Sequence, residues 1–322
     1  MTAHERGGGP HERALARVPG DAASLAELVR DLYADERQGG RVRHLAALLA
    51  ERRRVHHLVP LLEHPPEEPD AWAELVACLI QELVARRVTL VRVPAAARCA
   101  EALRGLGHPL AGLPLKRTRG ERRMDAAVLG PGWTPRGEQA LPEPPERDDW
   151  LAGRGSPDRA PRIVSMREDE RRIASAVEHW SAPAVAAVIE LPRRIDAQDL
   201  TPLGVNAFLP GALRAQIALY GAMTSLDAVV SELFAVAYCD ASYSRGLRGG
   251  YGRLAAWQSV AGLVRAPAGA SVHRINELAA RWRWTVFRII RRQPYWVDQE
   301  LAIGALSPRG TVLSLLVTHD TD

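Results

Sequence analysis

The stretch from Gly130 to Pro161 limits most strongly how this chain can fold, because it holds 7 Pro and 5 Gly among 32 residues. Proline interrupts helices and central strands, and glycine weakens both. Together with the absence of apolar periodicity, this composition predicts a linker or a long surface excursion. The 322 residues are enough for two domains. We therefore expect a disordered tail over residues 1–20, a helical domain over 21–113, a linker over 114–161 and a second domain over 162–322.

The first predicted domain carries apolar residues at helical spacing. After Ser24 and again after Asp70, Leu, Val, Ile and Trp recur every three or four residues, and Ser and Asp are residues that cap helix starts. Two shorter helices are expected after Gly39 and from Val55 to Leu62. This pattern predicts an all-helical region, either an irregular bundle or a short stack of helix pairs.

The second predicted domain mixes both periodicities. Acidic residues at Glu168 to Glu170 favour a helix start, because negative charge is stabilising at a helix N-terminus. Short apolar runs, and runs rich in aromatic and β-branched residues, favour strands. We expect helices over 168–180, 224–234, 251–264 and 271–282, and strands over 184–191, 284–290, 300–306 and 311–318, the last two forming a hairpin. The predicted fold class is α+β, with a small, mostly antiparallel sheet covered by helices.

The densest candidate site is the glycine-rich sequence before and within the helix predicted at 251–264. Glycines let a backbone approach a ligand, the first N–H groups of a helix attract anions, and arginines add positive charge. The residues that could bind an anion are Arg245, Arg248, Gly249, Gly250, Tyr251 and Arg253. The alternative is a tight structural turn between two helices, with positive φ at Gly250. The sequence favours this alternative, since a dinucleotide-binding motif requires a strand before the glycines.

A second candidate lies in residues 281–292, where arginines alternate with aromatic side chains. Such a pattern suits single-stranded nucleic acid, through phosphate contacts and base stacking. However, period-two alternation places Trp284 and Val286 on one face of the predicted strand and Phe287 and Ile289 on the other. Because both faces look buried, we expect these aromatics to form a core, and nucleic acid is a disfavoured partner.

Several chemistries are disfavoured by composition. Of 42 Lys plus Arg only Lys116 is lysine, and it follows no glycine-rich strand-to-helix turn, so phosphate-binding and Schiff-base lysine motifs are missing. The three cysteines have neither disulfide-framework nor zinc-site spacing. His319, Asp320 and Asp322 could in principle bind a metal, but a frayed chain end is the favoured interpretation. We expect no cofactor and no metal, and the catalytic residues, if any, are unknown.

Four blocks of sequence resemble an uncharacterised actinobacterial family, a domain of unknown function. They are Ala77–Val84, His108–Leu115, Gly249–Trp257 and the end of the final hairpin, Thr318–Asp322. The likeness weakens between Lys116 and Pro161 and around Ala182–Ala184. Because no activity is attached to that family, the resemblance implies the domain organisation and says nothing about mechanism.

Two classes of function remain open. The first is a cytoplasmic protein-interaction or scaffold protein without catalytic activity, whose partner is another protein. The second is a ligand-binding or enzymatic domain that uses residues 245–257 as a site for a small anionic ligand. No apolar stretch approaches the length of about 18 residues that a membrane span requires, so a membrane partner is not expected. Arginines paired with nearby carboxylates would favour the first class, and converging unpaired arginines the second.

Overall fold

The N-terminal helices form where the sequence predicts them. In the computed structural model, which describes residues 27, 39–129, 161–209, 217–241, 244–291 and 299–320, Asp70 caps the longest of them by accepting a hydrogen bond from the Ala73 N–H at 2.9 Å. The helices are α3 (Gly39–Arg52), α4 (Val55–Leu62), α5 (Ala71–Ala85) and α6 (Pro94–Gly105), the last of which the sequence analysis did not identify. The tail predicted over 1–20 and the helix predicted after Ser24 lie outside the described residues, Glu27 excepted.

The described strands form one antiparallel sheet, so the α+β fold class is confirmed. Its strand order is β1-β2-β6-β5-β4-β3, and every neighbouring pair is antiparallel. The strands are β1 (Arg162–Ile163), β2 (Val185–Glu190), β3 (Ile217–Thr224), β4 (Arg283–Arg291), β5 (Gln299–Leu306) and β6 (Val312–Asp320). The predicted hairpin is β5–β6. Strand β3 was missed: Thr224, expected to open a helix, ends this strand, and Ser225 is the helix N-cap.

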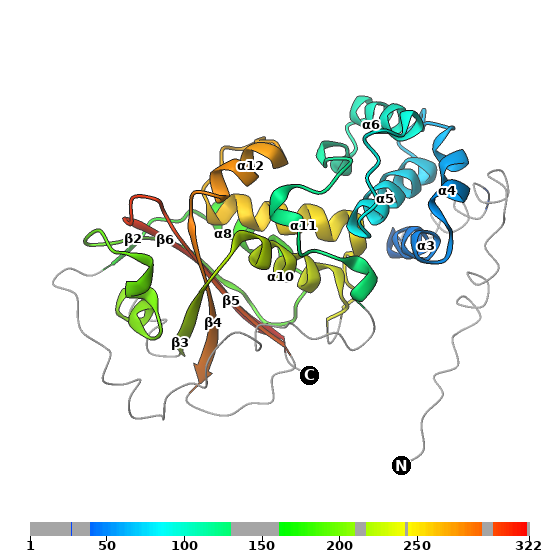
Figure 1. Ribbon diagram of the computed structural model, residues 1–322. Helices are drawn as coiled ribbons and strands as arrows, with labels where there is room; N and C mark the ends of the chain where they lie inside the picture. Colours follow the sequence, from blue (N-terminus) through cyan, green and yellow to red (C-terminus); the bar gives the residue numbers. More distant parts are fainter. Residues whose placement is uncertain are drawn as a thin grey trace, which may run out of the picture.

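Helices cover one face of the sheet and short 3-10 turns cover the other (Figure 1). The helices are α8 (Arg167–Ala174), α10 (Leu226–Tyr238), α11 (Arg248–Leu263) and α12 (Val272–Ala279). Trp284 of β4 packs into the core on the helical side, while Phe287 of the same strand packs with Leu200 and Phe208 on the other side. The expectation that both faces of this strand are buried is therefore correct at Trp284 and Phe287.

Helix α11 connects the two predicted domains. It packs against α10 and α8 on its sheet side and against α5 and α3 on its other side. One cluster of buried side chains consequently extends from Val42 in α3 to Leu316 in β6. Residues 114–129, assigned by the sequence to the linker, form 3-10 turns that bring Glu121 into this cluster, where it is fully buried. None of the described helices is long and apolar enough to cross a membrane.

The shared core changes what limited proteolysis should yield. The sequence predicts cleavage within 130–161 and survival of residues 162–322 as a folded fragment. We expect cleavage at that place, but we expect the two fragments to stay associated, because separation would expose the polar and apolar groups between α5 and α11 to water. Native size-exclusion chromatography of the cleaved protein tests this. Elution of folded 162–322 alone would instead support independent domains.

Candidate functional site

The glycine-rich segment begins α11, after a short loop that follows α10. The Gly246 N–H donates to Asp240 at 2.8 Å, and the Arg248 guanidinium donates to both oxygens of the same carboxylate at 2.9 and 3.0 Å. Arg248 has a φ of 61°, a left-handed conformation. Gly250 is not among the positive-φ residues, so the expectation of positive φ at that glycine is wrong. The positive φ before this helix therefore lies at Arg248 and not at a glycine.

An N–H group in the first turn of α11 donates to a carboxylate of the protein itself. The Gly249 N–H donates to Glu82 Oε1 at 2.7 Å, and Glu82, on α5, is fully buried. Burial raises the pKa of Glu82, while its ion pair with Arg86 and the Gly249 N–H act in the opposite direction. The position where the sequence analysis placed an external anion is thus filled by Glu82.

Arg253 lies one turn further along α11 and is fully buried. Its Nε and Nη2 donate to the two oxygens of Glu121 at 2.5 and 2.9 Å, and its Nη1 donates to Pro114 O at 2.7 Å. Gln81 and Lys116 O accept the remaining two N–H groups. Since a guanidinium has five N–H donors, Arg253 has none left for a ligand.

Glu121 is the carboxylate that balances this guanidinium. It also accepts hydrogen bonds from the Trp257 indole N–H at 2.9 Å and the Thr118 N–H at 2.6 Å. Burial acts to raise the pKa of Glu121, but the charge and hydrogen bonds of Arg253 outweigh it, so the pKa lies below its usual value. The pair is therefore an ionised, fully hydrogen-bonded salt bridge inside the core.

A third carboxylate, Glu74, lies two turns before Glu82 on α5. Its Oε2 accepts from the Tyr251 hydroxyl at 2.9 Å and lies 3.1 Å from His108 Nε2, and its Oε1 accepts from Arg43 Nε at 3.2 Å. His108 Nδ1 accepts the Leu110 N–H at 3.2 Å, so Nε2 carries the imidazole proton and donates to Glu74. Tyr251, predicted as a ligand group, is thus a hydrogen-bond donor to α5.

These contacts form one structural unit, which we call the α5–α11 joint. Its members are Glu74, Gln81, Glu82, Glu121, Tyr251 and Arg253. Four of the six predicted site residues lie against α5: Gly249, Gly250, Tyr251 and Arg253. The other two do not: Arg248 pairs with Asp240, and Arg245 is exposed on the preceding loop. Sequence reasoning missed the carboxylates. The available signal was the presence of Glu74, Gln81 and Glu82 in an otherwise apolar helix.

Two carboxylates of the joint, Glu74 and Glu121, have lowered pKa values and should make stability depend on acid. Burial acts to raise the pKa of Glu74, but hydrogen bonds from His108 and Tyr251 and the charge of Arg43 lower it overall. A lowered pKa contributes stability above the unfolded-state pKa of about 4.3, and this is lost as pH falls through the folded-state pKa. We expect Glu74→Gln to melt at a lower temperature at pH 7 and to lose less stability than wild type between pH 5 and 3. Equal losses in thermal scans would contradict this role.

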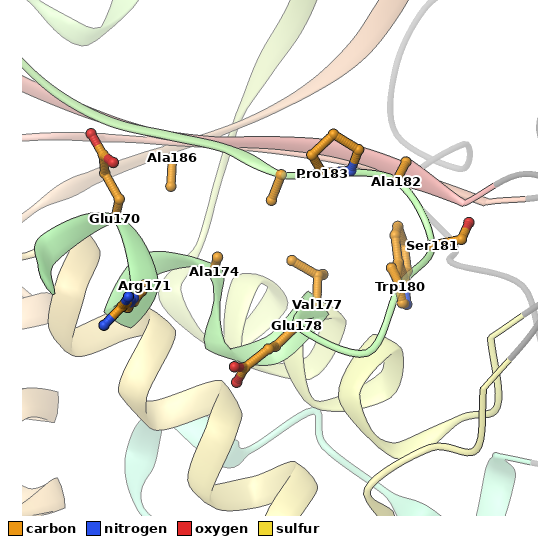
Figure 2. A pocket seen from close by; sticks show the side chains of 11 residues that line it. Glu170, Arg171, Ala174, Val177, Glu178, Trp180, Ser181, Ala182, Pro183 and Ala186 are labelled. Carbon is orange, nitrogen blue, oxygen red and sulfur yellow. The ribbon is translucent and has the colours of Figure 1, made fainter. Parts of the chain in front are cut away.

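A pocket of about 380 Å³ lies elsewhere, between α8, the turn after it and the start of β2 (Figure 2). Small apolar side chains such as Ala174, Val177 and Ala186 line its interior, and Trp180 stands at one end. Trp180 is 6% exposed, and among the residues that the structure describes its buried indole N–H has no hydrogen-bond partner. Glu170, Arg171 and Glu178 supply charge around the pocket. No group of three or more His, Cys, Asp or Glu residues in the described segments is arranged to hold a metal.

The fold and the joint define an α+β protein in which one buried ion pair, Arg253–Glu121, and hydrogen bonds from Gly249 and Tyr251 hold α11 against the helical layer. The chain belongs to a family of unknown function (DUF6183), whose model matches residues 10–322. This confirms the resemblance to a domain of unknown function. Comparisons with curated proteins and with solved structures give no match. Because the match covers both predicted domains, the family is defined by nearly the whole chain.

Proposed function

We propose that this protein is a protein-interaction or scaffold protein of the cytoplasm, without catalytic activity. The observation that carries the proposal is the internal pairing of the glycine-rich helix: Glu82 accepts the Gly249 N–H at its start, and Glu121 forms a salt bridge with Arg253. Groups held in this way stabilise a rigid body and are not free to bind a substrate. An actinobacterial source rests on the sequence resemblance alone.

The cysteines support both the cytoplasmic location and the lack of catalytic activity in this proposal. Cys78, Cys99 and Cys239 are free thiols and all are buried. Burial raises the pKa of Cys99 to about 11 and that of Cys239 to about 12, and it raises the pKa of Cys78 well above its usual value. Thiols in this state are not nucleophiles at neutral pH. Free thiols are typical of a reducing compartment.

The alternative is a small anionic ligand bound at the loop before α11. It is favoured by one observation, the exposure of Arg245 in that loop. Nucleic acid is less well supported, because Trp284 and Phe287, which would have to stack on bases, are 2% and 5% exposed. The alternative therefore depends on Arg245 and on backbone groups near it.

Two measurements distinguish these functions. Co-purification from the native host, followed by mass spectrometry of bound proteins and small molecules, should identify a protein partner. A thermal-shift screen of nucleotides and sugar phosphates should show no stabilisation. Arg245→Ala is the matched variant for this screen, because Arg253→Ala would damage the core and could not report on binding. A ligand that stabilises wild type but not Arg245→Ala would replace the interaction proposal by the alternative.

A further inference from the structure

Within the described part of the chain, strand β2 is paired along only one of its two sides over most of its length. Strand β6 pairs with all of Val185–Glu190, whereas β1 pairs only with the last two residues. The Val164 N–H donates to Val188 O at 2.8 Å, which identifies the β1 side as the one that Val188 faces. Backbone groups alternate along a strand, so the N–H and C=O of Ala186 face the same side. The described chain places no backbone partner there.

The start of α8 is the reason why the described chain adds no longer strand at this edge. If the β1–β2 register continued, Met166 would lie opposite Ala186. Instead the Met166 N–H donates to Asp169 at 3.0 Å, in the first turn of α8, so the chain turns away from β2. Met166 itself is 70% exposed, and Ile163 and Val185 nearby are 50% and 38% exposed. A set of exposed apolar side chains therefore flanks the unpaired backbone.

The opposite edge of the same sheet is protected. The Asn206 side chain donates to Leu219 O and accepts from the Leu219 N–H, at 2.8 and 2.7 Å, as a neighbouring strand would. The next outward N–H of β3, that of Gly221, donates to Pro202 O at 2.8 Å. Proteins commonly cover edge strands because a bare edge pairs with other chains. The contrast indicates that the edge at β2 is available for such pairing.

The pocket of Figure 2 adjoins this edge. Ala184 and Ala186 of the β2 segment line it, so a strand added beside β2 would direct every second side chain toward the same face. A second copy of this chain, paired antiparallel through β2, would present only small apolar side chains there, because Ala184, Ala186 and Val188 share this alternation. None of these side chains is large enough to fill about 380 Å³. The pocket therefore fits a partner with a bulky apolar side chain.

The charges around the pocket indicate what should flank that side chain. Glu170 and Glu178 line it against the single cation Arg171. Glu178 is exposed, and Glu170 is half-buried and accepts the Ser165 hydroxyl at 3.0 Å. An excess of carboxylates favours a cationic neighbour. We propose that the β2 edge binds an extended segment of a partner protein, which adds a strand at Ala186 and places a bulky apolar residue, flanked by Lys or Arg, in the pocket.

This inference rests on the proposed function, since it names the surface and the chemistry of the partner. A phage-displayed library of random linear peptides, selected on the full chain, supplies the probe. Enriched peptides should combine alternating β-formers, a large apolar residue and adjacent Lys or Arg. Their binding is then measured by fluorescence anisotropy on wild type and variants.

Three variants separate backbone pairing, pocket filling and charge. Ala186→Pro removes the outward N–H without touching the β6 ladder, Ala186→Phe fills the pocket, and Glu178→Arg reverses one charge. Ala186→Pro and Ala186→Phe should each raise the dissociation constant about tenfold or more. A change of this size corresponds to the loss of roughly one good hydrogen bond or apolar contact. Met223→Pro, at an outward position of the opposite edge strand, is the matched control and should bind like wild type. Selected peptides in which every second backbone nitrogen is methylated test the same strand pairing, because a methylated nitrogen cannot donate a hydrogen bond to β2 of the wild-type protein.

Several results would overturn the inference. One is that the same peptides are enriched equally on wild type and on Ala186→Pro. Another is that the enriched peptides are acidic. A third is that methylating the peptide backbone leaves its affinity for the protein unchanged. A wild-type dimer that Ala186→Pro converts to a monomer would show that a second copy occupies the edge. A native partner that still co-purifies with Ala186→Pro would refute this surface but leave the interaction function intact.

Discussion

Arg253→Met should destabilise the protein more than any other single substitution considered for it, by about 3–5 kcal/mol in the free energy of unfolding. Methionine approximates the length of the side chain but removes its charge and donors. It leaves the Glu121 carboxylate, which is fully buried, without its counterion, and Gln81 and two backbone carbonyls without donors. Urea denaturation followed by circular dichroism measures the loss.

Two controls show whether the loss arises from the buried pair. The double variant Arg253→Met/Glu121→Leu removes both charges, so it should be clearly more stable than Arg253→Met alone, because the uncompensated carboxylate is gone. Arg274→Met removes a partner of Glu277 at the surface, where both side chains are about half exposed, and should change stability by less than about 0.5 kcal/mol. Similar losses for Arg274→Met and Arg253→Met would contradict the role of the buried pair.

The sequence predicted the helices whose start and apolar pattern are encoded by residues within the helix or directly before it. Asp70 before an apolar helical repeat predicted α5, and the acidic first turn at Glu168 to Glu170 predicted α8. Strand β3 was missed because Gly221 interrupts its pattern. That glycine lies beside Phe287 of β4: a Cβ there would be 2.2 Å from Phe287 Cδ1, and a Cβ at Gly304 of β5 would be 2.8 Å from the same ring. The glycines make room for an aromatic residue on a neighbouring strand, which local propensity cannot reveal.

The joint could be predicted only in part for a related reason. The sequence analysis singled out residues on α11 because glycines and arginines cluster there, but it assigned them to an external anion and not to partners within the chain. Their partners are 132 residues away for Glu121 and 167 residues away for Glu82. No spacing rule connects such positions. A buried polar group needs a partner, however, so Glu74, Gln81 and Glu82 in the apolar helix α5 already implied that a donor-rich element would pack against it.

Gly249→Ala should cause the second largest loss, because the absent side chain leaves room for the Glu82 carboxylate of α5 against the start of α11. A Cβ at residue 249 would lie 2.4 Å from Cδ of Glu82 and 2.6 and 2.7 Å from its two oxygens. The carboxylate would have to leave the Gly249 N–H while remaining buried beside Arg86. We expect a cost of about 1–3 kcal/mol from overpacking, increased by the lost hydrogen bond.

Two other glycines provide a graded comparison by the same alanine substitution. At Gly250 the nearest atom to a new Cβ is Leu110 Cδ1 at 2.6 Å, the flexible end of a side chain, so the cost should be smaller. At Gly105, which ends α6, no atom lies within 4 Å, and alanine should be neutral or slightly stabilising because it lowers the entropy of the unfolded chain. Melting temperatures should therefore fall in the order Gly105→Ala, Gly250→Ala, Gly249→Ala. If Gly249→Ala has the same melting temperature as Gly105→Ala, the contact between Glu82 and the start of α11 does not hold the two layers together.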